Sequence, residues 1–277
     1  MTNIQEVLGD IERIEPFPTA AIRILELAMG DAEAEEIVAV IAEDPGLTAK
    51  ILRLANSAQY APQVTIDSVL QATNRLGSKA IVSLVMTTGC ASYFMGYGNS
   101  SSRSNSSLWE ECLHTALVAR RLSSHMGYSN PELAYTVGLL QNVGHIVLDR
   151  FMNFDRDEVV HLVEDGRAMC SAEQEIIGMD HALCGERIAR RWGLPDSFVQ
   201  GIRYHHRPAA AGHFRDLCEV TQTAEAITSV ALRDNGLSLL ERGVAISKGN
   251  HGLDGYELAT LVSEVRDDMY ETNFALS

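Results

Sequence analysis

The sequence contains nine histidines that could take part in metal chemistry, among them His114, His181 and the adjacent pair His205 and His206. Three neutral imidazoles can be enough to bind zinc. Hydrolysis of a phosphoester at two divalent cations requires more, because carboxylates must neutralise and bridge the ions, which amides cannot do. Each histidine also has a simpler interpretation as a core or surface imidazole bonded to backbone or water.

The segment around His181 predicts a helix that turns this histidine inward. At about 100° per residue, the face of His181 also carries Cys184, Gly185, Ile188 and Trp192. The opposite face carries Arg187, Arg190 and Arg191. We therefore expect these arginines to form a solvated face or a partner surface rather than an anion pocket. Arg203 and Arg207 flank the histidine pair, and either role is open for them.

The elements that position these residues are predicted to be helices throughout. No segment of convincing length alternates apolar and polar residues with a period of two. Helical spacing is found in residues 21–29, 35–43, 47–58, 66–77, 78–94, 108–126, 131–148, 155–166, 171–177, 180–193, 195–206, 213–233 and 254–271. The prolines fall mostly between these segments. The expected fold class is all-α.

One break in composition divides the chain. Glycine, serine and asparagine dominate residues 96–105, "GYGNSSSRSN", which is typical of a loop or a flexible joint. We therefore expect an N-terminal helical lobe over residues 1–95, a Ser/Gly-rich joint over 96–107, and a second helical lobe over 108–277. No pattern in residues 236–277 predicts a role for that segment.

Charge and composition exclude several classes of protein. The formal net charge is -15, which disfavours a nucleic-acid-binding protein or one that docks on anionic lipid. The five cysteines are scattered and form no CxxC pair, so buried reduced thiols are expected. Residues 1–10 lack a signal-peptide pattern, and the apolar stretch 80–95 is too short and polar to span a bilayer. A cytoplasmic protein without membrane association is the expectation.

Three motifs in the first lobe occur in a specific order. They are "IEPFPTA" (14–20), "IAEDPGLTAKILRLANSAQY" (41–60) and "IDSVLQATNRLG" (66–77). This order resembles the HDOD domain family, bacterial proteins related to the HD phosphohydrolases. The resemblance extends to about residue 235, and the long DP-x-L…LR-x-ANSA-x-Y string, which includes Leu47, makes it specific. It implies a two-lobed fold whose C-terminal lobe is HD-domain-like.

The motif residues also have local physical roles. Asp44 before Pro45 predicts a helix start, with the carboxylate accepting from free backbone amides. Asn56 and Ser57 stand near a helix end, where they either bond local backbone or line the seam between the lobes. Gly77 is well suited to end a helix.

The resemblance also implies which residues occupy the metal-ligand positions of the hydrolases. An HD phosphohydrolase gathers a histidine, a His-Asp doublet, further histidines and a final aspartate around one or two divalent metals. The corresponding residues here are His114, the pair Gln141 and Asn142, His181, His205 with His206, and Gln222. Imidazoles remain at four positions, whereas amides replace both carboxylates and the doublet histidine. We therefore expect no bound metal, no other cofactor and no catalytic residue.

The resulting functional hypothesis is a non-catalytic signalling or regulatory module with a degenerate HD site. HDOD proteins are usually associated with bacterial signal transduction, so the resemblance implies a protein partner or a small effector. Two alternatives stay open: a metal-dependent HD-type phosphohydrolase with altered ligands, and a sensor that binds a cyclic dinucleotide or ppGpp without cleaving it. A homodimer is also compatible with a broad apolar helical face. No motif names the partner, pathway or signal. His145, one turn after Gln141, is expected to be structural.

Overall fold

The computed structural model describes residues 4–30, 32–57, 60, 63–96 and 105–231, with residues 257, 260, 261, 263–265, 268 and 272 near the C-terminus. Over these residues the secondary structure consists of α-helices and two short 3-10 helices, without a strand. The expected all-α fold is confirmed. Most of the predicted joint, residues 97–104, lies outside the described residues.

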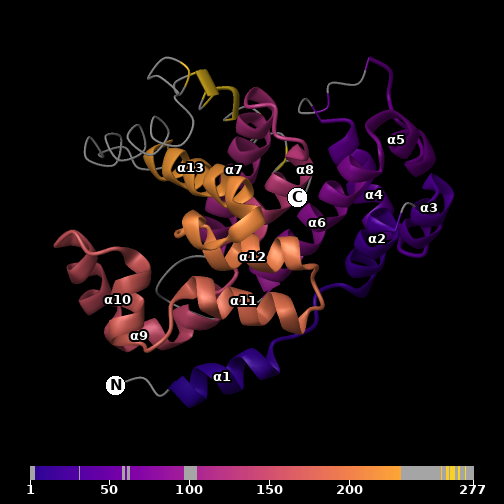
Figure 1. Ribbon diagram of the computed structural model, residues 1–277. Helices are drawn as coiled ribbons and strands as arrows, with labels where there is room; N and C mark the ends of the chain where they lie inside the picture. Colours follow the sequence, from indigo (N-terminus) through magenta and orange to yellow (C-terminus); the bar gives the residue numbers. More distant parts are fainter. Residues whose placement is uncertain are drawn as a thin grey trace.

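Four helices cluster at one end of the molecule, and a long helix connects them to the rest (Figure 1). The cluster consists of α2 (Thr19–Met29), α3 (Ala34–Ala42), α4 (Pro45–Ala55) and α5 (Val69–Leu76). The connecting helix, α6 (Ser78–Gly96), packs against α2, α4 and α5 on one side and against α7 and α8 on the other. Because α6 is buried between both groups, it is apolar around most of its circumference.

The second half of the chain forms a helical bundle that carries the histidines. Its elements are α7 (Asn105–His125), α8 (Pro131–Leu140), α9 (His145–Glu164), α10 (Met169–Ile176), α11 (His181–Arg191), α12 (Asp196–Tyr204), the 3-10 helices η1 (Pro208–Ala210) and η2 (Gly212–Phe214), and α13 (Arg215–Ala231). Helix α7 packs between α8 and α13, and α11 packs against α12. The first helix, α1 (Ile4–Arg13), contacts α9 and α11 (Figure 1).

The motif residues of the first lobe hold local backbone in place. Asp44 Oδ1 accepts from the backbone nitrogens of Gly46 and Leu47 at 2.9 and 3.0 Å and caps α4, with Pro45 in its first turn. The amide of Asn56 donates to the carbonyl of Ile66 at 2.8 Å and accepts from the backbone nitrogen of Ile66 at 2.8 Å. These two hydrogen bonds therefore connect the segment before α5 to the end of α4.

Two further motif residues lie at the ends of α4 and α5. Ser57 is buried beside Asn56. Gly77 ends α5 with a φ of 85°, in the left-handed region where glycine is favoured.

The rings of Phe17 and Tyr93 both pack on Trp192, with centroids 5.0 and 4.9 Å away. These rings attach the proline-containing segment before α2 to the second lobe.

The predicted single helix over residues 131–148 is wrong, because the chain turns at residues 141–144 between α8 and α9. At this turn Gly144 packs directly on α11. A Cβ atom at Gly144 would lie 1.9 Å from the carbonyl oxygen of His181 and 2.8 Å from the backbone nitrogen of Gly185. The close approach of two backbones forces the break, and Gln141 and Asn142 therefore lie in a turn rather than within a helix.

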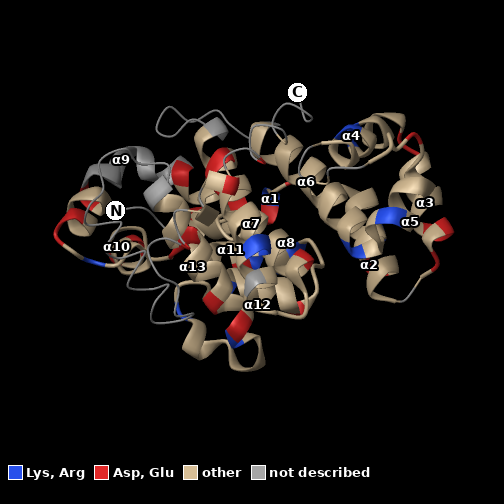
Figure 2. Cartoon of the chain, turned by 90° about the horizontal axis from the view of Figure 1, so that it is seen from above, with Lys and Arg blue, Asp and Glu red and all other residues tan. Residues whose placement is uncertain are grey.

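The surface carries charge of both signs. Acidic residues are spread over both ends of the molecule, and basic residues occur singly among them in the view of Figure 2. Among the described residues, no helix combines the length and the apolar character needed to cross a bilayer.

Candidate functional site

Helix termini position the histidines of the second lobe. His145 is the first residue of α9 and His181 the first residue of α11, while His205 and His206 directly follow α12. The start of α11 is fixed by Asp180, whose Oδ1 accepts from the backbone nitrogen of Leu183 at 2.6 Å. Rings that extend from helix ends can meet in one place, because the ends of α9, α11 and α12 are held together by close packing at Gly144 and Gly185.

Four imidazole rings form one cluster. His181 stacks on His145 with ring centroids 4.3 Å apart and an interplanar angle of 14°. On its other side, His181 Nε2 lies 3.3 Å from His205 Nε2 and 3.0 Å from His206 Nε2. His145, His181 and His205 are buried, and His206 is partly exposed. We call these four residues the histidine cluster.

A buried carboxylate from α10 supports the cluster. Glu173 has no exposed surface, and its Oε2 accepts from the backbone nitrogen of His181 at 2.9 Å and contacts His181 Nδ1 at 2.7 Å. His145 Nδ1 lies 3.8 Å from Glu173 Oε1. Burial alone would raise the pKa of Glu173, but the attraction of His181 outweighs it and lowers the pKa to about 2. Burial would conversely lower the pKa of His181, and Glu173 raises it above 6.5.

The pKa values of His205 and His206 are shifted toward the neutral form of the imidazole. Burial lowers the pKa of His205 well below its ordinary value of 6.5, and the neighbouring His206 and His181 lower it further. Burial also lowers the pKa of His206, although Glu225 on α13 opposes this shift. Glu225 Oε2 lies 3.5 Å from His206 Nδ1. The Cys170 Sγ atom lies within 4.8 Å of ligand nitrogens of His181 and His206.

Two of the three residues at the amide positions make hydrogen bonds, whereas the buried side chain of Gln141 has no hydrogen-bond partner among the described residues. Asn142 is buried, and its Nδ2 donates to Glu111 Oε1 on α7 at 3.1 Å. Gln222 Nε2 donates to the carbonyl oxygen of His206 at 3.3 Å. Gln141 is completely buried in the turn between α8 and α9. Gln141 and Asn142 therefore lie in the interior, whereas Gln222 is partly exposed and lines a pocket.

His114 is set apart from the other histidines. It is buried on α7, and its Nδ1 lies 3.2 Å from Thr228 Oγ1 on α13. Within the described residues, three groups of side chains could share a metal ion: Cys170 with His181 and His206, His145 with Glu173 and His181, and His205 with His206 and Glu225. His114 belongs to none of these groups. The structure thus brings His181, His205 and His206 together but not His114 with them.

The sequence motifs missed three residues of the site and the contribution of His145. Glu173, Glu225 and Cys170 match no ligand position of the hydrolases, so the conclusion that carboxylates are absent holds for those positions and not for the cluster. A signal for Glu173 existed, since it shares a helical face with Met169, Ile176 and Ile177. A charged residue within an apolar stripe indicates a buried partner. Glu225 lies one turn after Gln222 and shares its face.

The dinuclear metal centre of the HD phosphohydrolases does not fit these residues. Such a centre needs an anionic oxygen at the second doublet position to bridge two cations. Asn142 instead has an amide nitrogen directed at the carboxylate of Glu111, 3.1 Å away. Glu173 and Glu225 face the Nδ1 atoms of the histidines and so lie behind the rings rather than between two ions.

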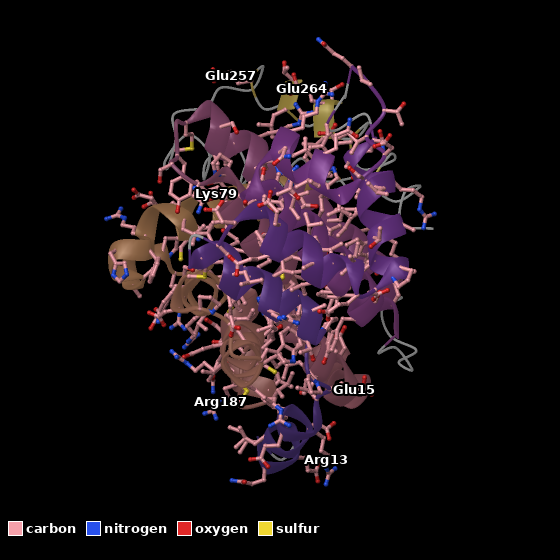
Figure 3. All side chains as sticks on the ribbon, turned by 90° about the vertical axis from the view of Figure 1, so that its right-hand side faces the viewer. Arg13, Glu15, Lys79, Arg187, Glu257 and Glu264 are labelled. Carbon is pink, nitrogen blue, oxygen red and sulfur yellow. The ribbon has the colours of Figure 1, made fainter. Side chains whose placement is uncertain are left out.

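A solvent-accessible pocket of about 580 Å³ borders the cluster. Its walls include Cys170, Ser171, His206, Arg207 and Gln222. Arg203 also lines the pocket and pairs with Glu186 at 3.2 Å and Asp180 at 3.5 Å. The three arginines on the far face of α11 are exposed, and Arg187 lies at the outer edge of the molecule (Figure 3).

The described residues thus form an all-helical fold in which a cluster of histidines borders a pocket. Comparison with protein families matches residues 14–208 to the HDOD domain. The chain belongs to the HDOD family. It is also 26% identical over 221 residues to an uncharacterized protein of Treponema pallidum (strain Nichols), which covers 74% of this chain and 41% of the relative. The chain thus spans about two fifths of that relative's length.

Solved structures with the same fold carry different functional descriptions. An HDOD domain protein of unknown function from Geobacter sulfurreducens superposes with a TM-score of 0.73 at 23% identity, over 98% of this chain and 95% of that one. A candidate phosphohydrolase from Shewanella amazonensis SB2B gives a TM-score of 0.73 at 22% identity, over 98% of both chains. A candidate signal transduction protein from Marinobacter aquaeolei VT8 gives 0.73 at 23% identity, over 98% and 61%. At these identities the similarity establishes the fold.

Proposed function

We propose that this chain is a non-catalytic regulatory module that acts by binding a protein partner or a small effector. The observation that carries this proposal is the hydrogen bond from Asn142 Nδ2 to Glu111 Oε1. It uses the doublet position as a structural donor, whereas hydrolysis of a phosphoester at two metals requires an anionic acceptor there. Membership of the HDOD family and the signal transduction description of one structural relative support the same proposal.

An assay of phosphoester hydrolysis tests the non-catalytic part of the proposal. The purified chain is incubated with Mn²⁺, Mg²⁺ or Fe²⁺ and with p-nitrophenyl phosphate or its diester. We expect the same background rate for the wild type and for His206→Gln, because a contaminating hydrolase does not depend on His206. Metal-dependent turnover that increases with protein concentration and disappears in His206→Gln would contradict the proposal.

The pocket beside the histidine cluster favours a small anionic effector as one form of this function. Arg207 is largely exposed at its wall, and Arg203 and Gln222 offer further donors. Asp180 lies 3.8 Å from Arg207, so an anion would have to compete with this carboxylate. Cyclic dinucleotides and ppGpp are the probes to screen by thermal shift, because a ligand of the folded state raises the melting temperature with concentration.

A matched pair of variants shows whether an effector binds at this pocket. A genuine effector is expected to lose its thermal shift in Arg207→Ala and to keep it in Arg187→Ala, which removes an exposed arginine outside the pocket. An equal thermal shift in both variants would place the binding elsewhere. If no nucleotide in the screen raises the melting temperature of the wild type, we retain the proposal that the chain binds a protein partner. Pull-down with the tagged chain from its native host then identifies the partner.

A further inference from the structure

A separate pocket lies where α2 and α6 meet α8 and α12, helices that are neighbours in Figure 1. Its volume is about 310 Å³, and it shares no lining residue with the pocket beside the histidine cluster. Pockets for small molecules have volumes of about 300–1,000 Å³. This pocket is therefore large enough for a ligand, but only for a small one.

The buried part of the lining is apolar. Its buried apolar side chains are those of Leu25, Val82 and Phe198. The buried hydroxyl groups of Ser83 and Thr136 also belong to the lining, but both donate to the backbone carbonyl oxygen of Glu132, at 3.4 and 2.9 Å. These hydroxyl groups are already used, so a ligand gains stability inside the pocket by burying apolar surface.

The exposed part of the lining carries hydrogen-bond donors. Lys79 is exposed, and Asn130 and Ser197 are partly exposed. In the part of the chain that the structure describes, the ammonium group of Lys79 forms no ion pair, and Asn130 Nδ2 and Ser197 Oγ donate to no protein acceptor. Asn130 uses only its side-chain oxygen, which accepts from the backbone nitrogen of Leu133 at 3.3 Å. Three donors, one of them cationic, are thus available to an anionic group.

Three helices begin at this pocket, and their first turns add partial positive charge. Lys79 lies in the first turn of α6, Asn130 is the N-cap of α8, and Ser197 lies in the first turn of α12. Pro195, which precedes α12, makes no side-chain cap hydrogen bond to the backbone N–H groups of that turn. Helix N-termini stabilise nearby anions, so the helix starts act in the same direction as Lys79.

Two carboxylates limit the negative charge that suits this pocket. Glu132 lines it, and Glu132 Oε2 lies 3.2 Å from Arg120 Nη2, which offsets the charge of the carboxylate. Asp196 is the exposed first residue of α12. A polyphosphate would be repelled by both carboxylates, whereas a ligand with a single negative charge beside Lys79 is compatible with them.

We propose that this pocket binds a medium-chain fatty acid, with its chain in the apolar interior and its carboxylate at Lys79. This class of ligand matches the apolar buried lining, the donors at the exposed edge and the preference for a single negative charge. The chain of the ligand contacts α2 and α6 on one side and α8 and α12 on the other, so binding stabilises the packing between these two groups of helices. Binding at this pocket does not require the proposed regulatory function.

Equilibrium dialysis and thermal shift with sodium decanoate test the proposal on the full chain. At concentrations where decanoate is monomeric, we expect saturable binding of one molecule per chain and a melting temperature that rises with concentration. Decyltrimethylammonium has the same chain and the opposite charge, and it should bind at least about tenfold more weakly. Lack of saturable decanoate binding, or equal affinity for the two amphiphiles, would overturn the proposal.

Matched variants locate the binding site. Lys79→Met should weaken decanoate binding by about five- to tenfold, whereas Lys50→Met changes a lysine outside the pocket and should bind like the wild type. Met29 and Met95 are both 59% exposed, but only Met29 lines the pocket. Met29→Glu should therefore weaken binding and Met95→Glu should not, and neither surface change is expected to prevent folding. A dissociation constant for Lys79→Met or Met29→Glu equal to that of its matched control would contradict the assigned pocket.

Discussion

The contact between Gly144 and α11 gives a sharp prediction about stability. The φ and ψ angles of Gly144, -60° and -28°, are ones that any residue adopts. Position 144 therefore requires glycine because a side chain would not fit there, and not because of its backbone angles. A Cβ atom would lie 1.9 Å from the carbonyl oxygen of His181, where about 3.4 Å is ordinary contact, and the clashing atoms belong to backbone. Gly144→Ala must separate α9 from α11 by more than an ångström.

The expected loss in the free energy of unfolding follows from the known effect of overpacking a protein core. Extra methyl groups in a packed core cost about 1–3 kcal/mol, and a clash with backbone belongs at the upper end. Roughly 3 kcal/mol would lower the melting temperature by roughly 6–12 °C in a protein of this size. Urea and thermal unfolding of Gly144→Ala measure the effect. The control is Gly9→Ala in α1, where a Cβ would meet no atom within 4 Å, and a small gain is expected. A melting temperature of Gly144→Ala within about 1 °C of the wild type would refute the argument.

Two further predictions concern Asn56 and Glu173. Asn56→Ala should lower the free energy of unfolding by about 2–3 kcal/mol because it leaves both polar backbone groups of Ile66 without the amide. Asn56→Asp keeps only the acceptor and should lose less; equal urea midpoints for all three proteins would contradict this. Glu173 stabilises as a carboxylate, above its ordinary pKa of 4.5, and this contribution is lost as pH falls toward about 2. His181 stabilises as a cation below 6.5, and its contribution is lost as pH rises through its raised pKa. In EDTA, the difference in stability between the wild type and Glu173→Gln should therefore be largest from about pH 4.5 to 6.5, and a difference independent of pH would count against the ion pair.

Local signals were sufficient for the fold class and for many helix ends. Periodicity of apolar residues reports which face of a helix is buried, and this property needs only neighbours in sequence. The Asp44-Pro45 start of α4 and the Gly77 end of α5 depend on backbone amides and φ angles within a few residues. The same reasoning placed His181 on the inward face of α11 and the three arginines on its outer face.

The turn at residues 141–144 could not be predicted in this way. Its sequence, Gln-Asn-Val-Gly, interrupts an apolar periodicity that otherwise continues. The break results from contact between Gly144 and α11, which is almost forty residues further along the chain. Contacts of this kind depend on how helices pack, and no local propensity encodes them.

In the candidate site, too, some features are predictable from the sequence and others depend on how the helices pack. The sequence, through its resemblance to the HDOD family, predicted that imidazoles persist and that amides replace the acidic ligands of the related hydrolases. Only the tertiary structure brought Glu173 and Glu225 behind the rings, separated His114 from the other histidines, and placed the Nε2 atoms of His205 and His206 within 3.3 Å of His181 Nε2. The physical reason is that the direction of a ring nitrogen is set by the acceptor on its other side. Two of these acceptors, Glu173 on α10 and Glu225 on α13, meet the rings of His181 and His206 only after the helices have packed.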